Sequence, residues 1–216
     1  MQEVGDNMAG IEIGIDDTAL EKVYQALKKY PKAAERAMVR LTNEAVTKAN
    51  GELLKRIPKK YNITKGDLQG GTKYASEASN NLIKAKKINS LNQTAKIEIR
   101  GSNLTLIRFV QENKPNKKGV VSQRVFAKVK KGRKKGFGKT TFIQTDKHGN
   151  PQVFQRRSGS RKINRLLKTT SVAHMAAKEE IATSVQDAAK EKFEKRSQHY
   201  IERELKKIKG WSKWRH

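Results

Sequence analysis

The sequence predicts an α+β fold in which an N-terminal helical arm packs on a small antiparallel sheet and a long C-terminal helix completes the chain. Two observations predict it. In the middle of the chain, short segments alternate apolar and charged residues, as in 121–129, and this alternation is typical of strands with one buried face. On either side, apolar residues recur every three or four positions, which is the period of a helix.

The first part of the chain should be mainly helical. Residues 1–9 lack periodicity and are expected to form a flexible arm, and a short alternating strand is expected over 10–15. A helix should begin at Thr18, because Thr18 and Glu21 have the spacing of a capping box, in which each side chain satisfies a backbone N–H of the other residue. Pro31 ends or kinks this helix before a second helical pattern begins.

The second helical pattern continues to Ile57, and Pro58 lies just beyond it. A brief helix capped by Thr64 is expected within 61–68. The strands on either side of 101–103 should form a hairpin. Taken in order, the expected strands after the second helix are 82–88, 94–100, 104–110, 121–129 and 141–145. Two further short segments of the predicted sheet follow, over 148–157 and 162–171.

Positive charge is concentrated in one part of the chain. Residues 104–171 hold 19 Lys or Arg but only two acids, which is +17 of the net charge of +27. A basic loop with three glycines is expected over 130–139, and 146–150 should be a hairpin turn because Gly149 and Asn150 tolerate positive φ. A charge excess of this size attracts polyanions or acidic protein surfaces. The alternative is a lysine-rich solvated surface with no charge partner.

The residue patterns predict neither an enzyme nor a cofactor or metal site. Gly138-Lys-Thr140 ends like a phosphate-binding loop, but Arg133 stands where that motif requires its first glycine. The chain has no cysteine, and its four histidines have no ligand partner at helical spacing. The first 21 residues carry six acids and no Lys or Arg, unlike a signal peptide, and no apolar run approaches the ~20 residues of a membrane span. No membrane contact is expected.

Apolar residues between Ile181 and Ile208 follow one stripe of a long helix expected over 177–209. At about 1.5 Å per residue this helix spans ~50 Å, which is more than a small sheet can cover. Part of it is therefore predicted to contact a neighbouring subunit through five candidate residues: Phe193, Tyr200, Leu205, Trp211 and Trp214. The alternative is a helix that folds back on its own domain and leaves the tryptophans frayed.

Several ordered patterns in the basic part of the chain resemble a known family. They are Leu106-Ile-Arg-Phe109, Val125-Phe-Ala-Lys-Val-Lys-Lys-Gly132, Gly149-Asn-Pro-Gln-Val-Phe-Gln-Arg-Arg157 and Ile163-Asn-Arg-Leu-Leu-Lys-Thr-Thr-Ser-Val-Ala-His-Met175. In this order they are similar to those of prophage minor tail protein Z, the tail completion protein of lambda-like phages, over about 19–176. The resemblance implies a structural virion protein with an α+β fold. It would act at the head-proximal end of the tail, so that a finished tail joins a DNA-filled head.

The resemblance also implies partners, a location and interface positions. A homo-oligomeric ring is expected to contact tail tube and tail terminator or connector proteins, and contact with packaged DNA is a further expectation. The protein would assemble in the host cytoplasm and remain in the virion tail. The candidates for an interface or a DNA channel are Arg108, Phe109, Arg124, Lys128, Lys130, Lys131, Arg133, Lys134, Lys135, Arg156 and Arg157. The ones that match the family patterns are Arg108, Phe109, Lys128, Lys130, Arg156 and Arg157.

The chain is thus expected to consist of a flexible arm (1–9), a tail-completion-like α+β domain (10–171) and a C-terminal helical extension (172–216). A competing hypothesis is a nucleic-acid-binding protein without sequence specificity, because basic loops contact phosphates. No helix-turn-helix, zinc-finger or RNA-recognition pattern is present. Assembly with tail proteins would favour the virion role, and tight, salt-sensitive binding of nucleic acid by a monomer would favour the alternative.

Overall fold

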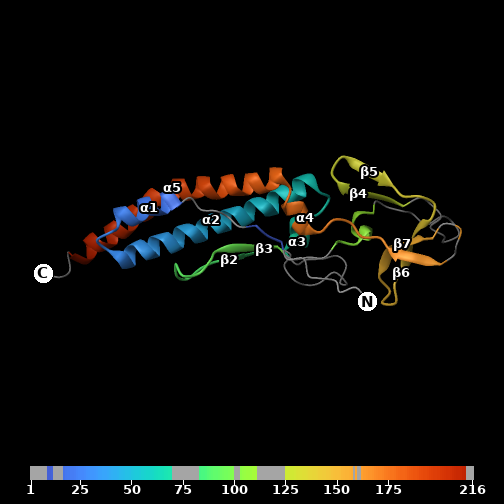
Figure 1. Ribbon diagram of the computed structural model, residues 1–216, viewed down its shortest axis with the longest axis horizontal. Coiled ribbons are helices and arrows are strands. Elements are labelled where there is room, and N and C mark those ends of the chain that lie inside the picture. Colours follow the sequence, from blue (N-terminus) through green and yellow to red (C-terminus); the bar gives the residue numbers. More distant parts are fainter. Residues whose placement is uncertain are drawn as a thin grey trace. The chain divides into compact units, whose positions relative to one another are not determined.

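A computed structural model describes residues 9–11, 17–69, 83–99, 103–110, 125–157, 159 and 162–212 (Figure 1). These residues form two compact units. The helical unit combines Ala9–Leu53, Ile83–Ile99 and the chain from Ala177 onward, and the sheet unit combines Leu54–Leu82 and Arg100–Ala176. The predicted α+β class is confirmed.

Three helices dominate the helical unit: α1 (Asp17–Ala26), α2 (Pro31–Lys60) and α5 (Glu179–Ser212). Pro31 is the first residue of α2, where its fixed φ suits a helix and its missing N–H is not needed. The helix continues past the end expected at Ile57, because Pro58 lies in its last turn and removes only one ladder hydrogen bond there. After Leu53, α2 passes from the helical unit into the sheet unit.

The core of the helical unit is built from residues spaced by four along two helices. On α2, the fully buried residues are Ala37, Leu41, Ala45, Ala49 and Leu53. On α5, the buried residues are Ile181, Val185, Ala189 and Phe193. Residues four apart lie on one face of a helix, so each helix has a continuous apolar stripe. Within this unit α5 runs alongside α1 and α2 (Figure 1).

A three-stranded antiparallel sheet completes the helical unit, in the order β1 (Ala9–Ile11), β3 (Lys96–Ile99), β2 (Ile83–Lys86). Ile97 and Ile99 are buried, whereas Glu98 is half-buried on the opposite face and pairs with Lys86 at 2.7 Å. This is the alternation expected of a strand with one buried face. Asn43 of α2 accepts a hydrogen bond from the backbone N–H of Ile88 and donates one to its carbonyl, each at 2.8 Å, which fixes the end of β2 to the helix.

The sheet unit contains two further antiparallel sheets. The first consists of β4 (Phe126–Lys130) and β5 (Arg133–Gly136), and the second has the order β6 (Thr141–Thr145), β7 (Pro151–Arg156), β8 (Ile163–Leu166). Two short helices, α3 (Lys65–Leu68) and α4 (Val172–Ala176), lie in the same unit. The predicted cap of α3 is confirmed: Thr64 accepts a hydrogen bond from the N–H of Asp67, whose carboxylate accepts one from Thr64 at 3.0 Å.

The strand expected over 104–110 is not formed. A 3₁₀ turn, η2 (Leu106–Phe109), takes its place, and β3 pairs with β1 and β2 instead. The physical reason is burial. Leu106, Ile107 and Phe109 are all buried, and a strand with one exposed face would expose either Leu106 or Ile107. The turn buries them together, and the N–H of Leu106 donates to the carbonyl of Leu167 at 3.0 Å.

The turn expected at 146–150 is confirmed. The carboxylate of Asp146 accepts hydrogen bonds from the backbone N–H groups of His148 at 2.8 Å and Asn150 at 2.9 Å. Gly149 has φ +79°, a conformation that residues with a Cβ rarely adopt. The turn therefore sets the register between β6 and β7, in which Thr145 faces Pro151.

Truncation of Phe109 should test the 3₁₀ turn as part of the core. Because the ring is fully buried, Phe109→Ala should lower the free energy of unfolding by about 3–5 kcal/mol. The matched control is Leu91→Ala, since Leu91 is 43% exposed and its loss should change stability by less than ~0.5 kcal/mol. Urea denaturation measures both, and equal, small effects would contradict the burial of Phe109.

Candidate interaction surface

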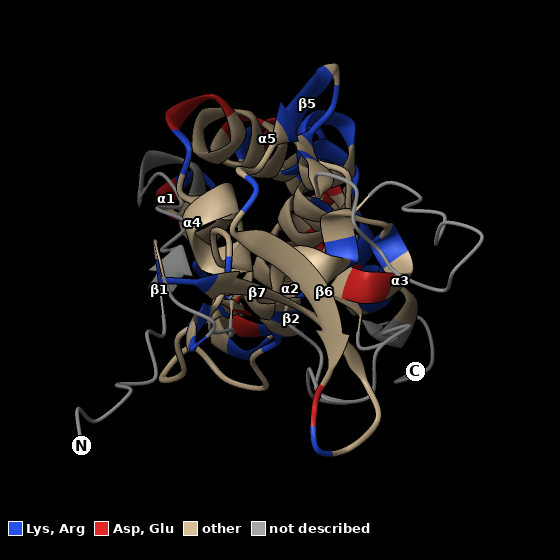
Figure 2. Cartoon of the chain, turned by 90° about the vertical axis from the view of Figure 1, so that its right-hand side faces the viewer, with Lys and Arg blue, Asp and Glu red and all other residues tan. Residues whose placement is uncertain are grey.

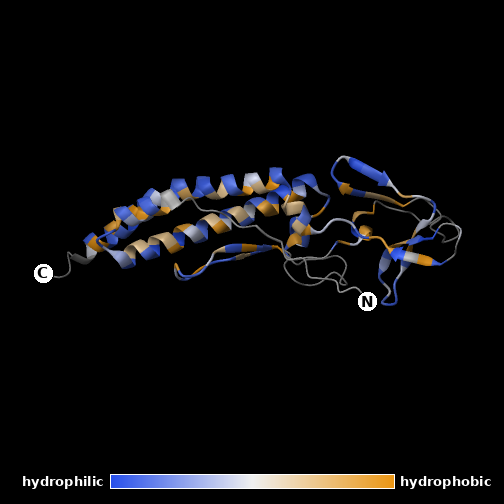
Figure 3. Cartoon of the chain, in the orientation of Figure 1, coloured by the Kyte–Doolittle hydropathy of each residue, from blue (hydrophilic) through white to orange (hydrophobic). Residues whose placement is uncertain are grey.

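The most basic feature of the sheet unit is the β4–β5 hairpin, residues 126–136, called here the basic hairpin. It carries six cations and no acid: Lys128, Lys130, Lys131, Arg133, Lys134 and Lys135. In Figure 2, β5 is drawn in the blue of Lys and Arg, and Figure 3 shows β5 as hydrophilic along its length. All of these side chains are exposed except that of Lys128, which is half-buried. The loop expected over 130–139 is thus partly a strand.

The basic hairpin is attached to the rest of its unit along the side of β4 that faces away from β5. The N–H of Asn62 donates to the carbonyl of Val129 at 2.8 Å, and the N–H of Lys131 donates to the carbonyl of Lys60 at 3.0 Å. Val110 forms an isolated bridge with Ala127 on β4. These contacts attach β4 to the rest of its unit. Among the described residues, β5 pairs with β4 alone and so is an edge strand.

Two lysines of β5 lie over aromatic rings. The Nζ atom of Lys134 is 4.6 Å from the ring centroid of Phe126, and that of Lys135 is 5.6 Å from the centroid of Phe137. Gly136 makes room for the first contact, since a Cβ atom there would lie 2.8 Å from Cε1 of Phe126. The rings hold the ammonium groups by cation–π attraction and restrict their motion.

No carboxylate of the described residues neutralises the charge of the basic hairpin. In the part of the chain that the structure describes, none of its six cations has a carboxylate within ion-pair distance. Exposed cations that are close together repel one another unless an anion lies near them. The hairpin is therefore a surface suited to an acidic or polyanionic partner.

The β6–β7 hairpin provides a second basic position. The guanidinium carbon of Arg156 lies 4.5 Å from the ring centroid of Phe142, and Phe142 packs against Phe154 with centroids 6.1 Å apart. Arg156 and Arg157 are both exposed. As on the basic hairpin, the cation lies over a ring face and is attracted to it, so these aromatic residues position positive charge.

The remaining interface candidates of the sheet unit have different positions. Arg108 is half-buried in η2, and Phe109 is fully buried, so Phe109 offers no surface to another molecule. The physical reason is the 3₁₀ turn, which directs Phe109 into the core. Arg124 lies outside the described residues.

The candidates on the long helix also differ from one another. Phe193 and Tyr200 are buried within the helical unit, which agrees with the alternative of a helix that folds back on its own chain. Leu205 is half-buried. The side chain of Trp211 and the whole of Trp214 lie outside the described residues.

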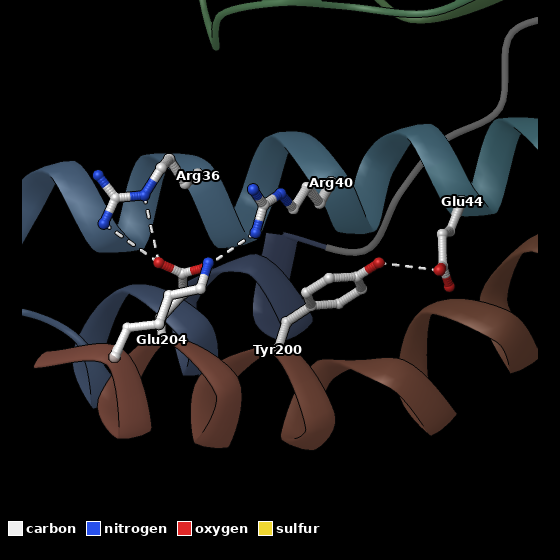
Figure 4. Close-up of polar contacts among 6 residues, drawn as sticks. Arg36, Arg40, Glu44, Tyr200 and Glu204 are labelled. Atoms are coloured by element: carbon white, nitrogen blue, oxygen red, sulfur yellow. Dashed lines mark hydrogen bonds and ion pairs between the residues drawn. The ribbon is translucent and has the colours of Figure 1, made fainter. Parts of the chain in front are cut away.

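A ladder of charged residues joins α2 to α5 within the helical unit (Figure 4). The fully buried carboxylate of Glu204 accepts hydrogen bonds from Arg36 at 3.1 Å and from Arg40 at 3.0 Å. Lys207, one turn further along α5, donates to the same carboxylate at 2.9 Å. Burial alone would raise the pKa of Glu204, but the hydrogen bonds from Lys207 and Arg36 outweigh it and hold the pKa below its ordinary value.

The next position of the ladder is Glu44 of α2. The hydroxyl of Tyr200 donates to its carboxylate at 2.8 Å, and the guanidinium of Arg196 donates at 3.1 Å. Lys192 adds an ion pair at 3.4 Å. Burial tends to raise the pKa of Glu44, but the hydrogen bonds from Tyr200 and Arg196 lower it overall.

Sequence reasoning did not find this ladder, although a signal was present. Its members recur every four residues on each helix: Arg36, Arg40 and Glu44 on α2, and Lys192, Arg196, Tyr200 and Glu204 on α5. Such spacing places each set on one helix face. The spacing alone does not show that these two helix faces meet, nor that α2 and α5 run antiparallel.

The described residues contain no group of three or more His, Cys, Asp or Glu placed to hold a metal ion. None of the helices described is long and apolar enough to cross a bilayer. In the described residues, cations lie on the exposed basic hairpin, and the carboxylates of Glu44 and Glu204 pair within the helical unit.

Comparison with known families places the chain among the structural proteins of bacteriophage tails. Residues 14–209 match the family model described as prophage minor tail protein Z (GPZ), and the chain belongs to that family. The match includes most of α5 and so extends beyond residue 176, where the resemblance was expected to end. The protein is therefore a structural component of the virion tail. No curated protein and no solved structure is significantly similar to it.

The ladder predicts a pH-dependent contribution to stability. Since the pKa of Glu204 is lowered in the folded state, its contribution is present above the ordinary value of 4.5 and is lost as the pH falls through the folded-state pKa. Glu204→Gln should lower the free energy of unfolding by about 2 kcal/mol near pH 7. At about pH 3 the difference from the wild type should be smaller.

The control for this prediction is Glu194→Gln, which changes an exposed carboxylate on the same helix and should alter stability by less than ~0.5 kcal/mol. Urea titrations at the two pH values measure both variants. A loss for Glu204→Gln that is the same at both pH values would contradict the ladder as an ionised network.

Proposed function

We propose that the protein completes the tail at its head-proximal end and so enables the tail to join the head. Membership of the minor tail protein Z family is the observation that carries this proposal. The ordered sequence patterns that resemble tail completion proteins support it, because they lie in the part of the chain that forms the sheet unit. Copies of the chain form a ring at the end of the tail tube, in contact with tail terminator or connector proteins.

In this proposal the basic hairpin is the contact surface. Its six cations have no carboxylate partner among the described residues, so they are available to acidic surfaces of the tail or to DNA that enters it. No catalysis is needed, since head–tail joining is an association of folded surfaces. Charge complementarity increases the rate of encounter and excludes partners of the same sign.

Nucleic-acid binding without sequence specificity is the second candidate function, and the uncompensated charge of the hairpin favours it. Lys134 lies over the Phe126 ring and Lys135 over the Phe137 ring, so the hairpin presents cations suited to phosphate contacts. Under this alternative, a purified monomer would bind duplex DNA, and the affinity would fall steeply with salt.

Charge reversal on the basic hairpin tests the proposed function. Lys130, Lys131, Lys134 and Lys135 are replaced by Glu, and tails lacking the wild-type protein are complemented with the variant. The yield of joined particles should fall by about a hundredfold or more, since several contacts reverse from attraction to repulsion. Plaque counts and electron microscopy measure joining.

The matched control reverses four exposed lysines of the helical unit, Lys22, Lys28, Lys29 and Lys32, and so changes the net charge equally. It should retain joining within about threefold of the wild type. If both variants lose joining to the same extent, the effect is one of net charge and the assignment to the hairpin is wrong. Full joining by the hairpin variant would also refute the assignment.

A further inference from the structure

We propose that the free edge of β5 binds an extended acidic segment of another tail protein, which it adds as a third strand beside the basic hairpin. The inference rests on the proposed function for its partner and specifies the chemistry of that partner. On the β4 side, the hairpin is already bonded to Lys60, Asn62 and Val110. On the β5 side, the described residues supply no further strand.

The pairing register identifies the backbone groups that face outward. The N–H of Phe137 donates to the carbonyl of Val125, so these two residues form a hydrogen-bonded pair. Bonded and non-bonded pairs alternate along an antiparallel ladder, and Lys135 pairs with Ala127 two residues further on. The backbone groups of Lys135 therefore point toward β4. Those of Lys134 and Gly136 point to the open edge, two residues apart, as an added strand requires.

The distribution of charge favours a strand over a DNA backbone. Successive side chains of a strand point to opposite faces, so Lys134 lies on the face of Phe126 and Lys135 on the other face with Phe137. A duplex approaching one face would meet only part of this charge. An added strand lies in the plane of the hairpin, and neighbouring carboxylates along it point to opposite faces, so that they meet lysines on both faces.

The same edge discriminates against other strands. Arg133, Lys134 and Lys135 are consecutive, exposed and without a carboxylate partner in the described chain. Positive charge on an edge opposes pairing with a basic strand, including β5 of a second copy. An acidic strand gains both the ladder hydrogen bonds and the opposite-charge pairs, so the edge selects its partner by charge.

Peptide binding to the full-length protein tests the proposal. The probe is a synthetic peptide of about eight residues in which pairs of Glu alternate with pairs of Val, so that each face carries carboxylates. A fluorescent label reports binding at about 150 mM salt. The control peptide has the same sequence with alternate backbone nitrogens methylated, so it keeps the charge but loses ladder donors. The control should bind roughly tenfold more weakly. Hydrogen exchange of the Lys134 and Gly136 amides should slow by roughly tenfold when the unmodified peptide is bound.

Two variants separate charge from strand addition in the protein itself. Lys134→Ala removes one cation, and Lys134→Pro removes the same cation together with the outward N–H. Lys134→Pro should bind the peptide roughly fivefold more weakly than Lys134→Ala. Lys147→Ala removes an exposed cation from the β6–β7 turn and should leave peptide affinity within about twofold of the wild type. If Lys134→Pro disrupts the hairpin, the two peptides on the wild-type protein still decide the question.

Four outcomes would overturn the proposal. They are equal affinity for the two peptides, no binding of either, tighter binding of a short DNA duplex than of the peptide, and protection of the β5 amides by self-association without peptide. Equal affinity would mean that the contact depends on charge alone. Tighter binding of DNA would make the surface a phosphate-binding site, and self-association would assign the edge to a second copy of the chain. All four are measured on purified protein, so failure here is distinct from a failure of the tail-joining role, which is measured on particles.

Discussion

The attachment of α5 to α2 through the buried carboxylate of Glu204 is the constraint on which the helical unit depends. Three cations surround that carboxylate, and Glu44 forms a second such centre with Tyr200 and Arg196. The chain has 21 acids against 48 Lys and Arg. Each carboxylate paired inside the helical unit therefore leaves fewer carboxylates to balance the cations on the surface. Breaking the Glu204 centre would leave cations of both helices close together with no anion between them.

The sheet unit shows the consequence of this excess of Lys and Arg over acids. Its basic hairpin has cations but no acid, and rings and strand pairing hold some of these cations in place. A free monomer with such a surface carries a cost in self-repulsion, which an acidic partner removes. Family membership gives the chain a structural role in the phage tail, and the charge of the hairpin fits the contact proposed for it with an acidic neighbour.

Much of the fold could be predicted because local rules decide it. The cap at Thr64, the turn at Asp146 and the alternation around Glu98 each depend on a few adjacent residues. The turn at Leu106–Phe109 could not, because its three apolar side chains are buried by segments distant in sequence. β5 has no apolar residue and so no alternation; its partner strand alone makes it a strand. The sequence predicted the basic surface from its charge. The free edge of β5 could be identified only from the pairing register of β4 and β5 in the structure.

The central claim is that this chain acts at the junction of head and tail, and locating it in particles tests that claim most directly. Particles from the source phage would be incubated with a gold-labelled antibody raised against the chain and imaged by negative stain, with mass spectrometry to establish its presence. Label at the head–tail junction is the expected result. Label at the distal tip or along the tube, or absence from particles together with recovery of the chain on cellular nucleic acid, would contradict it.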